Sequence, residues 1–364
     1  MKIPRQYYFF SQKVLICTLI LSVITMSSPI MAGLRAYDTI PGVRNPRAIH
    51  FDTLTPTEHP GINDSLPPFR HHTNSDFRYL THREVSKPRL LAVSAAHAIA
   101  WGGTFLALNN AWYRDYPRSA FHFFDDRKEW NQMDKAGHIW TAYQLSRISA
   151  EAWYWTGLDY RKSAWLGGAS AFAFQSVIEI LDGFSSEWGF SVGDMEANLI
   201  GSAGYVAQEL LFQNQVFQFK LGYRPYNYPE NLKARRDNLF GATLPEQLLK
   251  DYNSQRYWLS GNIKSMFPDW NVPGWLNIAV GYSADGMYGG HGNTWSDKQG
   301  NSFDYTHIKR TRRFYLAPDI DLTKIRTNSK VLKTVFFVVN SVKIPAPTFE
   351  INSSGKVVFR PIMF

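Results

Sequence analysis

Residues 134–147 read DKAGHIWTAYQLSR and place an Asp, a Lys and a His within five positions. On a helix, Asp134 and His138 share one face because they are four residues apart. Lys135 is expected to point away from that face. The spacing leaves two interpretations open: a functional site, or only the polar start of a helix.

Two further polar pairs stand at helical spacing later in the chain. Glu179 and Asp182 are three residues apart, and Asp194 and Asn198 are four residues apart. If the helices that carry these pairs are antiparallel, all three polar clusters meet at one end of a bundle. The candidate set is then Asp134, Lys135, His138, Glu179, Asp182, Asp194 and Asn198.

Such a set could perform three kinds of chemistry. Carboxylates with an imidazole could bind a divalent cation. His138, tuned by Glu179 or Asp134, could act as a general acid or base, which makes His138 and Glu179 the candidate catalytic residues. Lys135 with His138 could hold an anionic headgroup. We expect no cofactor, with a divalent cation as the alternative.

Helix ends explain several of these acids without any ligand. Asn131 stands three residues before Asp134, and Ser191 stands three residues before Asp194, which is capping-box spacing with Asp in place of the usual Glu. Asp182 precedes a glycine, a good helix stop. Glu179 and His138 have no such local role, and burying a lone carboxylate is costly. A functional centre and a buried structural network therefore both stay open.

Four apolar stretches of helical length must position these residues. The third contains many Gly and Ala, which allow a neighbouring backbone to approach closely. The expected fold class is α+β: an antiparallel helical bundle of about four helices, followed by a β-rich C-terminal region. The expected helices cover residues 89–112, 133–155, 160–183 and 193–212.

Alternation marks the C-terminal region. VFQFKLGY and LNIAVGYS alternate as strands do, and a hairpin is expected around residues 352–355. On FYLAPDIDL, Asp319 and Asp321 share one face, which we expect to be exposed and solvated. Residues 231–259 are polar and helix-prone. About six strands are expected, fewer than the roughly eight of a full outer-membrane barrel.

The N-terminus has the three parts of a secretory signal peptide. An apolar run (residues 14–26) follows a basic start, and small residues lead to Ala32. The run is short for a membrane-spanning helix, although an uncleaved anchor remains the alternative. Cys17, the single cysteine, lacks the small preceding residues of a lipoprotein processing box. Cleavage after Ala32 would leave no cysteine, which excludes disulfides, thiolate metal sites and cysteine catalysis.

Charge and hydropathy restrict the partners. The formal charge of +9 falls by three, to +6, when the basic residues of the signal peptide are removed. An exported basic protein meets anionic lipid or glycan rather than nucleic acid. The mean hydropathy of −0.28 argues against a polytopic membrane protein. The expected organisation is a signal peptide (1–32), an irregular arm (33–88), a helical bundle (89–213) and a β-rich region with a helical insertion (214–364).

A motif pattern over about 80 of the 364 residues resembles the YfiM-like family of predicted periplasmic or outer-envelope proteins, a domain of unknown function. More distantly, the pattern is similar to VanZ-like membrane proteins. The resemblance implies an envelope location and no established reaction. The matching residues are Asp134, His138, Glu179, Asp182, Ser191, Asp194, Asn198 and Gly201.

These observations favour an exported cell-envelope protein, non-enzymatic and associated with the outer membrane, with a structural or lipid-interacting role. Phe364, with Ile362 two residues before it, resembles the end of outer-membrane strands. One alternative is an envelope enzyme that acts on lipid or cell-wall precursors through a His/carboxylate centre. Another is a soluble periplasmic bundle that binds a partner. The expected partner is membrane lipid or an envelope protein.

Overall fold

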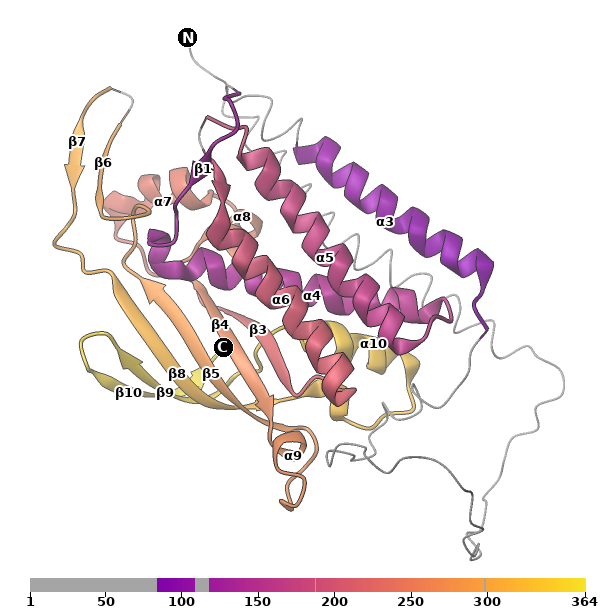
Figure 1. Cartoon of the computed structure of the whole chain (residues 1–364). Coiled ribbons are helices and arrows are strands. Elements are labelled where there is room, and N and C mark those ends of the chain that lie inside the picture. The colour runs from indigo at the N-terminus through magenta and orange to yellow at the C-terminus, as the bar shows by residue number, and fades with distance from the viewer. Residues whose placement is uncertain (1–83, 109–117, 187, 298) are drawn as a thin grey trace, which may run out of the picture.

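The computed structural model describes residues 84–108, 118–186, 188–297 and 299–364. The predicted signal peptide with Cys17, most of the predicted arm (33–83) and the predicted end of the first helix (109–112) lie outside this part of the chain. Figure 1 shows four long helices followed by a sheet. The expected α+β fold, with helices first and an antiparallel sheet after them, is confirmed.

The long helices begin close to the predicted positions, and the last three also end close to them. Each one is a long stretch rich in apolar residues, and this composition marks it in the sequence. They are α3 (Lys87–Leu108), α4 (Met133–Trp155), α5 (Tyr160–Asp182) and α6 (Val192–Phe212).

Helices α4, α5 and α6 pack against one another, and small residues let them approach closely. A Cβ atom added to Gly201 of α6 would lie 2.3 Å from the carbonyl oxygen of Ile139 in α4. Only glycine therefore fits at this crossing. Helix α3 lies beside α5 (Figure 1), where Trp101 packs on Phe174 of α5.

Six antiparallel strands form the sheet, in the order β10-β9-β8-β5-β4-β3. The predicted hairpin joins β9 to β10, with Gly355 at a φ of 81°. The strands are β3 (Phe217–Tyr223), β4 (Gln255–Asn262), β5 (Leu276–Asp285), β8 (Thr311–Ile320), β9 (Ala346–Asn352) and β10 (Val357–Met363).

Shorter elements connect these parts. Two strand pairs, β1 with β2 and β6 with β7, lie outside the main sheet. The connecting elements are β1 (Phe123–Phe124), η3 (Glu129–Gln132), β2 (Phe190–Ser191), η4 (Glu230–Leu232), α7 (Lys233–Phe240), α8 (Leu244–Lys250), α9 (Ile263–Met266), β6 (Thr294–Ser296), β7 (Ser302–Asp304), η5 (Leu322–Lys324) and α10 (Lys330–Val339).

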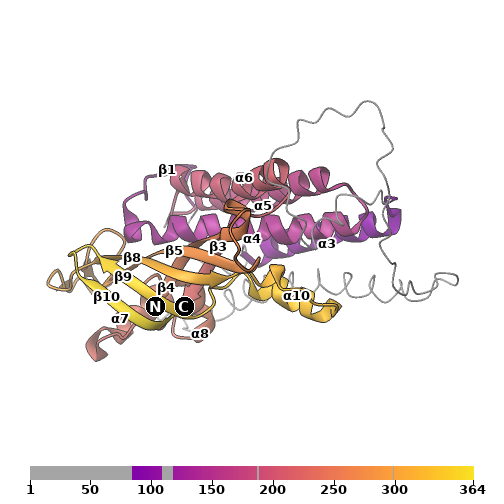
Figure 2. The same cartoon turned by 90° about the horizontal axis from the view of Figure 1, so that it is seen from below.

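The main sheet has two distinct faces. We call outer the face that carries Ile278 and Val280 of β5, and inner the opposite face. Helix α4 covers the outer face at β3 and β4, where Tyr143 packs on Phe219 with ring centroids 5.4 Å apart. The sheet curls around its inner face, so that its two edge strands, β3 and β10, come close together. A Cβ atom on Gly222 of β3 would lie 2.4 Å from the backbone of Phe364, just after β10. Figure 2 shows the sheet below the helical layer.

The prediction that residues 231–259 are helix-prone is only partly right. Helices α7 and α8 lie there, but β4 begins at Gln255. From that residue the side chains alternate: Tyr257 and Leu259 belong to the outer face, whereas Trp258 is buried on the inner face. Pairing with β3 and β5 on both sides outweighs the local helix propensity.

Candidate functional site

The start of α4, the end of α5 and the start of α6 meet, and their polar side chains form one cluster. The ring nitrogen Nδ1 of His138 lies 3.8 Å from Oε1 of Glu179. Its Nε2 lies 3.8 Å from Oδ1 of Asp134 and 3.6 Å from Oδ1 of Asp194. We call this cluster the polar centre; its members are Asp126, Asp134, Lys135, His138, Glu179, Asp194 and Asn198.

Lys135 is central to the cluster, so the prediction that it points away is wrong. Its ammonium nitrogen lies 2.6 Å from Oδ2 of Asp126, 2.7 Å from Oδ1 of Asp194 and 3.1 Å from Oδ2 of Asp134. The long, flexible side chain turns back to the start of α6. Gly193, at the start of α6, leaves room for the lysine side chain. A Cβ atom on Gly193 would lie only 3.0 Å from Cε of Lys135.

Asp126 was not found from the sequence. It precedes α4 in a loop, and no helical spacing links it to the other acids. Ser191 connects it to α6, because its hydroxyl donates a hydrogen bond of 2.6 Å to Asp126 and accepts one of 3.0 Å from the backbone N–H of Asp194. The predicted Ser191 cap is thus confirmed, with a second role added.

The other predicted cap, Asn131 on Asp134, is wrong. Asn131 and Gln132 have φ values of 50° and 63°, and the N-cap residue Gln132 makes no side-chain cap bond. Asp134 is instead held by the C-terminal half of the chain, since the Tyr252 hydroxyl donates a hydrogen bond of 2.6 Å to its Oδ1. Tyr252 follows α8 and has no motif that could have marked it.

Asn198 is fully buried and orients the imidazole. Its Oδ1 lies 3.0 Å from Nδ1 of His138 and accepts a hydrogen bond of 2.7 Å from Gln175 of α5. Gln175, one turn before Glu179, was not predicted. Asp182 is half-buried at the end of α5, and α5 stops there as expected. Asp182 is near enough for its charge to act on Glu179.

Burial and mutual charge shift the titration of this cluster. Burial raises the pKa of Glu179 to about 8, against the attraction of His138. Burial and the charge of Asp134 raise the pKa of Asp194 to about 7. Burial opposes the charged imidazole, but Asp134, Asp194 and Glu179 outweigh it and raise the pKa of His138 to about 9. Burial also opposes the charged ammonium of Lys135, but Asp134, Asp194 and Asp126 outweigh it and raise the pKa of Lys135.

These shifts predict that stability falls as the pH rises. Glu179, Asp194 and His138 each bind a proton more tightly in the folded chain, so the free energy of unfolding decreases from their ordinary pKa values of 4.5, 3.8 and 6.5 up to about 8, 7 and 9. The melting temperature should therefore drop between about pH 5 and pH 9. Glu179→Gln should flatten this slope, whereas the exposed-site control Glu196→Gln should not. A melting temperature constant over this range would contradict the assignment.

Two chemistries fit the geometry to different degrees. Ligand atoms of Asp134, His138 and Asp194 lie within 4.8 Å of one another, which suits a divalent cation. The ammonium of Lys135, 2.7 Å from Asp194, already supplies positive charge there. A cation would also have to displace the proton of His138. The donor set therefore fits proton binding and charge balance better than it fits a metal.

The sheet is a second candidate site, and here polar side chains are buried while apolar ones face out. The prediction that Asp319 and Asp321 are solvated is wrong, because they are 2% and 0% exposed. On the outer face, eight large apolar side chains are 45–64% exposed; we call them the outer sheet patch: Ile278, Val280, Phe314, Leu316, Phe349, Ile351, Val357 and Phe359.

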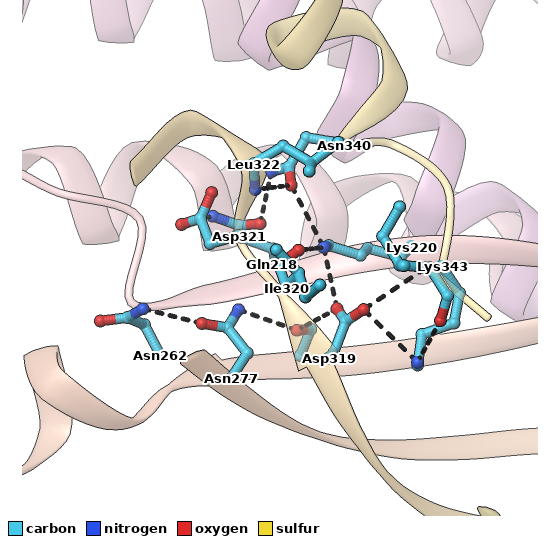
Figure 3. Close-up of polar contacts among 12 residues, drawn as sticks. Gln218, Lys220, Asn262, Asn277, Asp319, Ile320, Asp321, Leu322, Asn340 and Lys343 are labelled. Atoms are coloured by element: carbon cyan, nitrogen blue, oxygen red, sulfur yellow. Dashed lines mark hydrogen bonds and ion pairs between the residues drawn. The ribbon is translucent and has the colours of Figure 1, made fainter. Parts of the chain in front are cut away.

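Figure 3 shows how the buried charges of the inner face are satisfied. Lys220 pairs with Asp319 at 2.8 Å and donates to the carbonyl oxygen of Ile320 at 2.7 Å. Lys343 lies 3.4 Å from the other oxygen of Asp319, and the Ser260 hydroxyl donates a hydrogen bond to the oxygen that pairs with Lys220. All four polar residues are buried, so each depends on the others.

The same network fixes the segment after β8. Asn340, the C-cap of α10, accepts hydrogen bonds from Lys220 and from the backbone N–H of Leu322, and donates one of 2.7 Å to Gln218. Gln218 in turn donates to Asp321 at 2.7 Å. The buried polar groups thus hold α10 and η5 against the inner face.

One family comparison bears on this chain. Residues 122–209 match the model of a family described as "Predicted periplasmic lipoprotein (DUF2279)". The match supports an exported, periplasmic location and a domain of unknown function. No curated protein and no solved structure matches the chain. Over residues 122–209, the stretch that contains the polar centre, the chain is thus similar to a family of predicted periplasmic lipoproteins.

Proposed function

We propose that this chain is an exported envelope protein that binds the lipid of the outer membrane through the outer sheet patch, in a non-enzymatic role. The observation that carries the proposal is the reversed sheet: apolar side chains face out and paired charges face in. Apolar-out and polar-in alternation is what strands adopt against lipid. The motif resemblance to YfiM-like envelope proteins supports the same location.

The size of the patch argues for a lipid contact. Fully burying one exposed large apolar side chain is worth about 1.5–3 kcal/mol. Eight such side chains lie about half-exposed on four neighbouring strands, so covering each of them is worth roughly half of that. A monomeric protein in water rarely leaves an apolar area of more than a few hundred Å² uncovered. A bilayer would cover this patch without any change in the sheet.

The helical layer is compatible with such contact. Helix α5 is long and apolar enough to cross a membrane by length and composition, and it is the one helix of the described segments that is. Trp165 and Leu166 of α5 and Leu199 of α6 are exposed. Core helices share these properties, so the outer sheet patch and not α5 carries the proposal.

The non-enzymatic part of the proposal rests on the charge balance in the polar centre. One ammonium, that of Lys135, lies within 3.1 Å of three carboxylates from three segments. Such a group joins α4, α6 and the preceding loop. We therefore propose a structural role for His138 and Glu179 in the same network.

Flotation with vesicles tests the membrane contact. The purified protein should float with zwitterionic phospholipid vesicles in a density gradient, and Val280→Asp with Phe349→Asp should abolish flotation. Both positions are exposed, so the variant should still fold. The matched control changes two exposed apolar residues outside the patch, Leu244→Asp in α8 with Leu106→Asp in α3, and should float. If the patch variant floats as well as the unchanged protein does, the proposal fails.

A further inference from the structure

Helix α10 carries an apolar stripe that the rest of the described chain leaves uncovered. Five of its side chains are 39–54% exposed. Their spacing of three, four and seven residues puts them on one face of the helix. They are Val331, Leu332, Val335, Val338 and Val339.

The opposite face of α10 holds this orientation. The guanidinium of Arg147 in α4 lies 4.2 Å from the ring centroid of Phe337 and also donates a hydrogen bond to the Phe337 carbonyl oxygen. Asn340 anchors the C-terminal end in the inner network, and Ser329 caps the N-terminal end. These contacts fix the rotation of α10, so its apolar stripe faces away from the rest of the protein.

The charged residues of the segment that contains α10 are of one sign. Residues 322–349 contain five basic residues and no Asp or Glu. Lys324 and Lys343 donate hydrogen bonds within the protein. Arg326, four residues before the helix, and Lys330 and Lys333 in its first turn are exposed. By helical spacing the two lysines lie on the side of α10 opposite the stripe. An outward apolar face with lysines on the polar face is typical of a helix in a membrane interface.

We propose that α10 lies in the interface of the membrane and recognises anionic lipid: its stripe sits among the acyl chains, and Arg326, Lys330 and Lys333 lie at the phosphate headgroups. This inference rests on the proposed function. Figure 2 shows α10 below the layer of α5 and α6, in the same lower part of the view as β9 and β10. One bilayer could therefore contact α10 and the outer sheet patch together.

Vesicles of different charge distinguish binding through α10 from binding through the outer sheet patch. The unchanged protein should bind vesicles with about one-third anionic phospholipid more tightly than zwitterionic vesicles, and high salt should remove the gain. A basic residue near an anionic surface contributes about fivefold. Lys330→Gln with Lys333→Gln should thus reduce the gain on the order of tenfold or more and leave zwitterionic binding unchanged. The control Lys128→Gln with Lys309→Gln, exposed lysines away from α10, should keep the gain.

The stripe has its own test. Val335→Ser with Val338→Ser should weaken binding to both kinds of vesicle, and circular dichroism should show that the protein still folds. If the lysine variant keeps the full anionic gain, or the valine variant binds normally, the inference about α10 fails while the sheet contact stands. If the unchanged protein binds neither kind of vesicle, both the inference and the proposed function fail.

Discussion

Asp319→Asn should lower the free energy of unfolding by about 3–5 kcal/mol, because it removes one partner of a buried ion pair. The substitution keeps the shape of the side chain but leaves Lys220 and Lys343 buried without a carboxylate. Both lysines are at most 1% exposed, so water cannot replace the lost charge. Urea denaturation of the purified protein, followed by circular dichroism, measures the change.

Two comparisons make this result specific. Asp269→Asn changes an exposed carboxylate and should alter the free energy of unfolding by less than about 0.5 kcal/mol. Adding Lys220→Met to Asp319→Asn should recover part of the loss, since one uncompensated charge is then removed. A loss below about 1 kcal/mol for Asp319→Asn alone would show that the inner network does not stabilise the sheet.

Lys135→Met should destabilise the protein by a similar amount, about 3–5 kcal/mol. The variant leaves three carboxylates, from Asp126, Asp134 and Asp194, without the ammonium that lies within 3.1 Å of each. Asp126 and Asp194 are nearly buried, so their repulsion is weakly screened. The melting temperature should fall most at high pH, where His138 also loses its proton.

Lys128→Met is the matched control for Lys135→Met, because Lys128 is exposed in the same part of the chain. It should change the free energy of unfolding by less than about 0.5 kcal/mol. Equal stability of the two variants would mean that the ion pairs of Lys135 do not hold α4, α6 and the preceding loop together. The proposal of a non-enzymatic role would then lose its basis.

The helices could be predicted almost residue by residue, whereas the orientation of the sheet could not. Helix α4 was expected at residues 133–155 and is found there, since apolar side chains recur along its whole length. Alternation also located β5 and β8. Alternation separates two faces but does not say which one is buried, and the general rule that acids are solvated placed Asp319 on the wrong side.

The polar centre could be predicted in its helical part. Antiparallel succession of α4, α5 and α6 was enough to bring His138 near Glu179, although whether either has a chemical role stays a prediction. Asp126 and Tyr252 could not be identified from the sequence, because they belong to loops that only the three-dimensional fold brings near α4. The direction of Lys135 was wrong because a four-carbon chain reaches partners that its backbone position does not face.

Helix α4 belongs to both layers of the molecule, and this sharing has a consequence for cooperativity. Its polar end accepts a hydrogen bond from Tyr252, its middle packs on Phe219 of β3, and Arg147, one turn further along, holds α10. If the sheet separated from the helices, α4 would lose its contacts with Tyr252, Phe219 and α10, and one of its packed faces would become exposed to solvent. Backbone amides in the middle of α4 should thus exchange with solvent as slowly as those of β4, as parts of a single folding unit.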